Sequence, residues 1–83
     1  MTPATSASTA FKRAMLDGEA YLRAQDAARI LTEAGVSPIS AGGKLRTHVR
    51  RGDIQAYEVH PRAWLYREVD VRALADRYRT VAR

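Results

Sequence analysis

The chain contains no cysteine among its 83 residues, and this absence excludes several kinds of functional site. Without thiols it cannot form a disulfide, a thiolate nucleophile or a zinc site with cysteine ligands. The two histidines, His48 and His60, have neither a metal-ligand spacing nor a close acidic residue that we expect to orient them. The glycine pair Gly42-Gly43 matches neither the P-loop nor the dinucleotide-binding pattern. We therefore expect a protein that is not an enzyme and that holds no cofactor or metal ion.

Long apolar runs are also lacking. No stretch approaches the roughly 18 apolar residues that a membrane-spanning helix needs, and no apolar segment follows a basic start at the N-terminus. We expect a cytoplasmic protein without membrane contact. Apolar residues nevertheless make up 46% of the chain, which favours a folded protein over a disordered one. At this length the sequence predicts one small domain with room for a single core.

Basic residues outnumber acidic ones only in the second half of the chain. Residues 1–40 carry four basic and four acidic side chains, whereas residues 41–83 carry ten basic and five acidic ones. The whole net charge of +5 therefore belongs to the second half. Such an excess is typical of a surface that binds a polyanion such as DNA or RNA. The alternative is a solvated cationic surface without a partner.

The N-terminal residues are small and polar. We expect residues 1–9 to be a flexible tail, because they cannot bury enough apolar area to order themselves. Residues 10–18 are expected to form a short helix that Gly18 ends, with Phe11 and Met15 four residues apart on one face. This helix would pack on its own domain or on a partner, such as a neighbouring copy.

The rest of the chain, residues 19–83, is expected to form one winged helix-turn-helix domain. The fold class is α+β, mostly α, and its predicted elements in order are helix 23–34, helix 41–51, strand 54–59, strand 64–66 and a closing helix capped by Asp70. The two strands would pair as a two-stranded wing. The expected core residues are apolar side chains at helical or strand spacing: Ala27, Ile30, Leu31, Leu45, Val49, Ile54, Trp64, Tyr66, Val71, Leu74 and Tyr78.

The second predicted helix has the properties of a helix that reads DNA. Leu45 and Val49 would hold it to the core, and long polar side chains would face the major groove, where arginine can bond guanine bidentately. The residues expected to contact DNA are Gly43, Lys44, Arg46, Thr47, Arg50 and Arg51 from this helix, His60 and Arg62 from the wing tip, Arg67 from the wing base, and Arg23 and Gln25 from the start of the first helix. The alternative for the helix is a solvated cationic face, and for the wing tip a solvated turn.

Residues 21–78 resemble the excisionase and MerR-like winged helix-turn-helix family. The matching pieces are residues 26–31 (DAARIL), 35–37 (GVS), 50–54 (RRGDI) and 64–71 (WLYREVDV). The chain is most similar to phage excisionases, also called recombination directionality factors. That resemblance implies a protein of a bacterial host cell that binds attachment-site DNA cooperatively and bends it. It would direct a phage integrase, a tyrosine recombinase, toward excision without cleaving DNA itself.

The sequence departs from this family at two places, and it leaves other functions open. The stretch 37–43 is longer than the usual turn, and the wing tip 60–63 (HPRA) lacks the frequent glycine. One alternative is a small MerR-like transcriptional regulator. An alternative of another class is a protein-interaction module such as an antitoxin, which would bind DNA no more tightly than non-specifically.

Overall fold

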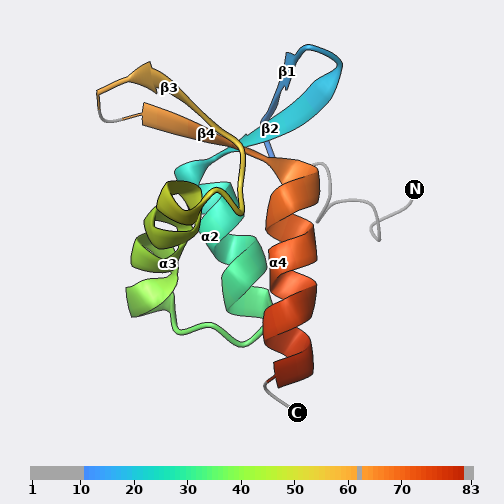
Figure 1. Ribbon diagram of the computed structural model, residues 1–83, viewed down its shortest axis with the longest axis vertical. Helices are drawn as coiled ribbons and strands as arrows, with labels where there is room; N and C mark the ends of the chain where they lie inside the picture. Colours follow the sequence, from blue (N-terminus) through green and yellow to red (C-terminus); the bar gives the residue numbers. More distant parts are fainter. Residues whose placement is uncertain (1–10, 62, 82–83) are drawn as a thin grey trace, which may run out of the picture.

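The computed structural model describes residues 11–61 and 63–81, which form three helices and one four-stranded antiparallel sheet (Figure 1). In chain order the elements are β1 (Arg13–Leu16), β2 (Glu19–Arg23), α2 (Ala24–Glu33), α3 (Pro38–Arg51), β3 (Ala56–His60), β4 (Ala63–Arg67) and α4 (Glu68–Val81). The expected N-terminal tail, residues 1–9, lies outside the described residues. Within them, no helix has the length and apolar character needed to span a bilayer.

The predicted winged helix-turn-helix fold is wrong. The order of strands in the sheet is β1-β2-β4-β3, so the hairpin β3–β4 is continuous with a second hairpin, β1–β2. The two hairpins join where β2 pairs with β4, with Leu22 opposite Tyr66. The strands expected to form a free two-stranded wing are therefore half of a four-stranded sheet, and the domain has the order β-β-α-α-β-β-α.

The short helix expected at residues 10–18 is also wrong. Residue 10 lies outside the described part, and Arg13–Leu16 is strand β1. Asp17 and Gly18 have φ angles of 52° and 78°, and two consecutive positive φ angles produce the tight turns that fit antiparallel hairpins. Phe11 packs against the core, whereas Met15 in β1 is exposed. The spacing of these two residues therefore reflects no helical face.

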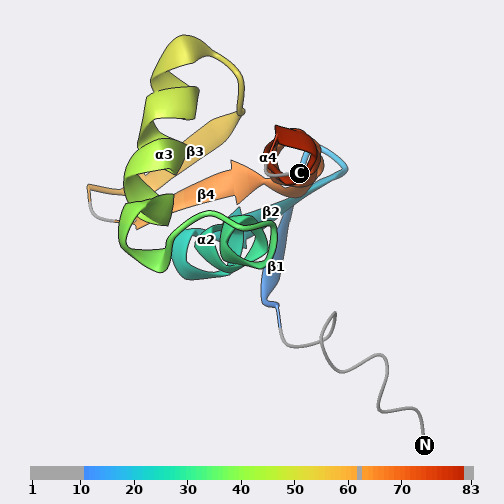
Figure 2. The ribbon, with the colours of Figure 1, turned by 90° about the horizontal axis from the view of Figure 1, so that it is seen from below.

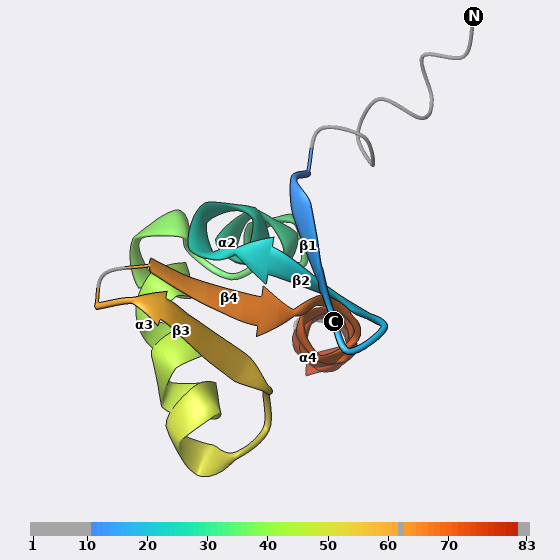
Figure 3. The same cartoon turned by 90° about the horizontal axis from the view of Figure 1, so that it is seen from above.

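The helices cover one face of the sheet, and the core lies between the two layers. Figure 1 shows the sheet above the helices, with α2 between α3 and α4. Viewed from below and above, α3 lies on the β3–β4 side of the molecule, and α4 lies near the β1–β2 turn (Figures 2 and 3). Each helix and β2 contributes one of the largest fully buried side chains: Leu22, Leu31, Leu45 and Val71.

The expected core residues are mostly found in this interior. Those that are buried are Ala27, Ile30, Leu31, Leu45, Ile54, Tyr66, Val71 and Leu74. Val49 and Tyr78 are half-buried and pack against them. The prediction that Trp64 lies in the core is wrong, because this residue of β4 is 36% exposed. No helix covers Trp64 fully, so it forms part of the molecular surface.

The turn between α2 and α3 is shorter than the sequence suggested. α2 ends at Glu33 and α3 begins at Pro38, which is a proline at the first turn of the helix. Proline is tolerated there because its missing N–H would have had no partner inside the helix. The glycines Gly42 and Gly43, expected near the helix start, are therefore interior positions of α3.

Candidate nucleic-acid interface

Helix α3 has two sharply different faces. Its buried side consists of Ala41, Leu45 and His48, which are spaced four and three residues apart. The opposite side, which we call the outer face of α3, consists of Ile39, Gly43, Arg46, Thr47 and Arg50, all of them exposed. Spacings of three and four residues keep these side chains on one face of a helix.

The outer face of α3 is cationic and free of carboxylates. The helix carries Lys44, Arg46, Arg50 and Arg51 and no aspartate or glutamate. Among the residues that the structure describes, neither Arg46 nor Arg50 has a carboxylate within salt-bridge distance. Arg51 Nε lies 3.7 Å from Asp53 Oδ2, just beyond the end of the helix. Two guanidinium groups are therefore available to an anionic partner.

Five arginines outside α3 are paired with neighbouring carboxylates. The pairs are Arg13 with Glu68, Arg23 with Asp26, Arg67 with Asp70, Arg72 with Glu68, and Arg79 with Asp76. Their nitrogen–oxygen distances range from 2.6 Å for the first pair to 3.8 Å for the second. Arg46 and Arg50 differ from these five arginines, whereas Arg29 and Arg77 likewise have no carboxylate within salt-bridge distance among the described residues.

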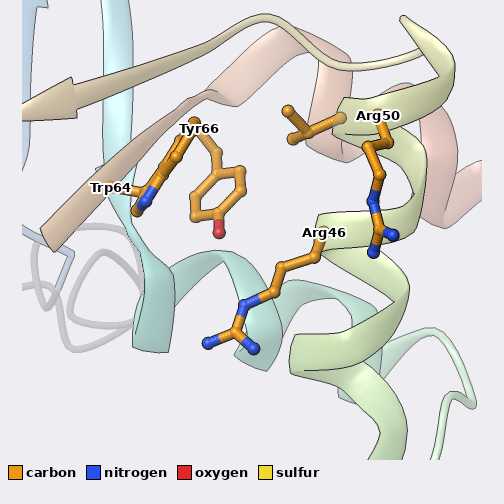
Figure 4. A pocket seen from close by; sticks show the side chains of 5 residues that line it. Arg46, Arg50, Trp64 and Tyr66 are labelled. Atoms are coloured by element: carbon orange, nitrogen blue, oxygen red, sulfur yellow. The ribbon is translucent and has the colours of Figure 1, made fainter. Parts of the chain in front are cut away.

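A groove runs between α3 and β4 beside the outer face. Arg46, Val49 and Arg50 line it from the helix, and Trp64 and Tyr66 line it from the strand. Figure 4 shows the two aromatic side chains on one wall and the two arginines on the other. We call this hollow, of about 230 Å³, the α3–β4 groove. Burial raises the pKa of the Tyr66 hydroxyl, and the positive charge of Arg46 partly opposes that rise.

The groove extends toward the start of α2 and the tip of the β3–β4 hairpin. A second hollow of about 460 Å³ shares three of its lining residues with the first, and Ala24 and Pro61 complete its lining. Trp64 thus lines both hollows, and the residue is 36% exposed. A ligand on the outer face of α3 would have this aromatic wall next to it.

The structure brings together the residues that the sequence predicted on the reading helix. Gly43, Arg46, Thr47 and Arg50 share the outer face, while Lys44 is half-buried with its Nζ 5.7 Å from the centroid of the Tyr78 ring. The Thr47 hydroxyl donates to the Gly43 carbonyl at 3.0 Å. Its donor is therefore already used, and only its methyl group and lone pairs remain for a ligand.

The other predicted contacts do not converge with α3 in the same way. Arg67 donates two hydrogen bonds to Asp70, which raise the pKa of its guanidinium, and Arg23 lies 3.8 Å from Asp26 at the start of α2. Gln25 is exposed in the first turn of α2, and His60 is exposed at the end of β3. Arg62 lies outside the described residues. The predicted contacts from β4 and α2 are thus already engaged or separate from the outer face.

Two surface residues of the site were missed by sequence reasoning. Ile39 is 96% exposed, the most exposed large apolar side chain on the described surface. Its spacing from Gly43 and Arg46 could have placed it on the outer face, but the expected helix began two residues after it. Trp64 was expected inside the core, because a lone tryptophan in a small domain usually anchors packing.

The structure also corrects the prediction that His48 lacks an acidic partner. His48 Nδ1 lies 2.7 Å from Asp53 Oδ2, and Nε2 lies 2.9 Å from the Tyr78 hydroxyl. The hydrogen bond with His48 lowers the pKa of the Asp53 carboxyl, and the nearby charge of Arg51 acts in the same direction. His48 therefore joins the end of α3 to the following loop and to α4, which fixes the helix that carries the outer face.

Comparison of the chain with protein-family models, curated proteins and solved structures finds no match. The resemblance to excisionases stays a prediction from the sequence. Function must therefore be argued from the chemistry of the α3 surface.

Proposed function

We propose that the protein binds double-stranded DNA through the outer face of α3. The observation that carries this proposal is a helix free of carboxylates whose exposed Arg46 and Arg50 have no acidic partner in the described part of the chain. An α-helix fits the major groove of B-DNA, and arginine can donate two parallel hydrogen bonds to guanine O6 and N7. Cations not neutralised within the protein are available to phosphates as well.

The glycine pair in α3 supports a close approach of DNA to the helix. A Cβ atom added at Gly42 or Gly43 would meet nothing within 4 Å. Each glycine in a helix interior costs about 1 kcal/mol relative to alanine. The described packing gives no reason for this cost, whereas a DNA backbone lying against the helix would need the space.

Ile39 adds an apolar contact at the beginning of the same face. An isoleucine exposed to 96% is solvated at a free-energy cost unless a partner covers it. In the major groove the methyl group of thymine is the apolar feature that such a side chain contacts. The outer face therefore combines apolar and bidentate polar groups, which is the combination that reading a base sequence requires.

The first test compares single arginine variants by fluorescence anisotropy with a labelled duplex from the protein's own locus. Arg46→Ala and Arg50→Ala should each weaken binding by about 1–3 kcal/mol, because each removes a base or phosphate contact. The matched control is Arg79→Ala, which removes an exposed arginine of α4 that is paired with Asp76. An equal loss in all three variants would show that α3 has no special role.

At a finer level, we propose that the protein is an excisionase, on the strength of the residue pattern that resembles that family. It would bind attachment-site DNA cooperatively, bend it and direct a phage integrase toward excision. The free two-stranded wing of the family is here part of a four-stranded sheet, so any contact from the β3–β4 side has a more rigid base. A recombination assay with the cognate integrase tests this proposal. Unchanged recombination directionality on adding the protein, despite DNA binding, would instead favour a transcriptional regulator.

A further inference from the structure

The α3–β4 groove has an aromatic wall beside its two arginines, and contact with a fully paired duplex does not explain that wall. Arg46 belongs to both the groove and the outer face, so DNA bound to α3 would pass the mouth of the groove. We propose that the groove receives one unpaired nucleotide of the bound DNA, with its base against Trp64 and its phosphate at Arg46 and Arg50. This inference rests on the proposed DNA-binding function and names the form of DNA that the site prefers.

The walls of the groove suit a nucleobase rather than a bare anion. Val49, Trp64 and Tyr66 give it an apolar and aromatic lining, with Trp64 and Tyr66 side by side on the strand wall (Figure 4), and Trp64 is partly exposed. Stacking on an aromatic side chain is the usual way in which proteins hold unpaired bases, and it is largely independent of sequence. A phosphate alone would gain nothing from these walls.

The volume of the groove is also large enough for a nucleobase. Cavities of about 150 Å³ are known to admit a benzene ring, and this groove has about 230 Å³. It therefore has room for a larger ring. Bases within a duplex are stacked on their neighbours, and only an extruded or otherwise unpaired base can offer its face to a protein pocket.

Charges around the groove orient the nucleotide. Arg46 and Arg50 reach it from α3, whereas Glu58 lies directly opposite Trp64 in the β3–β4 pairing. Directly opposed residues of an antiparallel pair project to the same face of the sheet. A carboxylate on the hairpin side repels phosphate, so the phosphate belongs on the helix side and the base on the strand side.

The test uses Trp64 as its own reporter, because it is the only tryptophan in the chain. The full-length protein is titrated with two duplexes of the same sequence, one fully paired and one with a single extra unpaired nucleotide in one strand. We expect the second duplex to bind roughly tenfold more tightly, the gain of one stacked base. It should also quench the tryptophan fluorescence more strongly.

Two variants separate the groove from the rest of the surface. Trp64→Ala should abolish the preference for the unpaired nucleotide, whereas Trp64→Phe should keep part of that preference. The matched control is Tyr57→Ala. Tyr57 is 49% exposed and lies opposite Leu65, so it projects from the other face of the sheet. This variant should retain the full preference.

The outcomes distinguish failure of this inference from failure of the proposed function. Equal affinity and equal quenching with the two duplexes would overturn the groove assignment and leave DNA binding by α3 intact. A preference that survives in Trp64→Ala would also overturn it. No binding to either duplex would overturn both proposals.

Discussion

The partner of each arginine decides what that arginine can do in this molecule. Arg13 and Arg72 are both held by the carboxylate of Glu68, so Arg13 ties β1 to α4 and Arg72 forms a pair within α4. Arg46 and Arg50 have no such partner among the described residues, although they lie in the same small domain. An arginine without a neighbouring carboxylate is therefore a better candidate for a DNA contact than an arginine held in an ion pair.

The two interior glycines of α3 allow stability and DNA binding to be separated. Gly42→Ala and Gly43→Ala should each raise the free energy of unfolding by up to about 1 kcal/mol, because alanine favours the helix and meets no obstruction. Only Gly43 belongs to the outer face of α3, so Gly43→Ala should weaken DNA binding more than Gly42→Ala. Urea denaturation and anisotropy titration measure the two effects.

The control for this pair is an alanine placed on another helix. Thr80 is exposed in α4, and Thr80→Ala should stabilise the protein slightly without a change in DNA affinity. If the glycine variants bind DNA as well as the unaltered protein, no close approach occurs at α3.

At the scale of elements, Glu68 connects β1 to α4. It is the first residue of α4 and accepts hydrogen bonds from Arg13 Nε of β1 at 2.6 Å and from Arg72 Nε of α4 at 2.8 Å. These bonds, that of Arg13 foremost, lower the pKa of the Glu68 carboxyl from 4.5 to about 2. The β1–β2 hairpin is thereby tied to α4 by a charge that must stay ionised.

This tie predicts an acid-sensitive component of stability. Because the pKa of Glu68 is lower in the folded state, its contribution is complete above pH 4.5 and is lost as the pH falls toward 2. We expect a loss on the order of 1 kcal/mol, since water screens the partly exposed partners. Urea denaturation between pH 6 and pH 2.5 should show a smaller loss in Glu68→Gln.

Glu33→Gln is the control for the removal of one carboxylate, because Glu33 is exposed at the end of α2. The account fails at this element if Glu68→Gln and the unaltered protein lose stability in parallel throughout the acid range.

The elements that could be predicted from the sequence are those with a local signal. The faces of α2, α3 and α4 follow from apolar residues three and four apart, and their buried residues, such as Leu31 and Leu45, lie where that spacing places them. Asp17-Gly18 carried a local signal too, since this dipeptide between apolar residues favours a hairpin. It was interpreted as the end of a helix, and the error removed two strands from the predicted fold.

The features that could not be predicted depend on contacts between distant segments. The pairing of Leu22 with Tyr66 joins the two hairpins into one four-stranded sheet, and no local sequence pattern near either residue predicts it. The exposure of Trp64 follows from the gap that α3 leaves beside β4, and His48 meets Tyr78 only once α4 is packed. The cationic helix was therefore predictable, whereas the groove beside it was not.

At the scale of the whole molecule, the cationic helix α3 and the ion pair between β1 and α4 lie on different sides of the domain. α3 lies on the β3–β4 side, away from the ion pairs that join β1 to α4 (Figures 2 and 3). Helix α3 carries four of the 14 lysines and arginines of the chain and no carboxylate, so its surface is cationic. This arrangement predicts one orientation of the protein on DNA, with α3 against the duplex and the open face of the sheet turned away.

The most direct test of DNA binding by α3 is the salt dependence of duplex affinity. Arg46 and Arg50, the two available cations of α3, should together contribute about −2 to the slope of a plot of log K against log salt concentration, since each phosphate contact contributes about −0.9. The double variant Arg46→Ala/Arg50→Ala should have a slope about two units shallower. The same slope in both proteins, or a slope near zero in the unaltered one, would contradict the account.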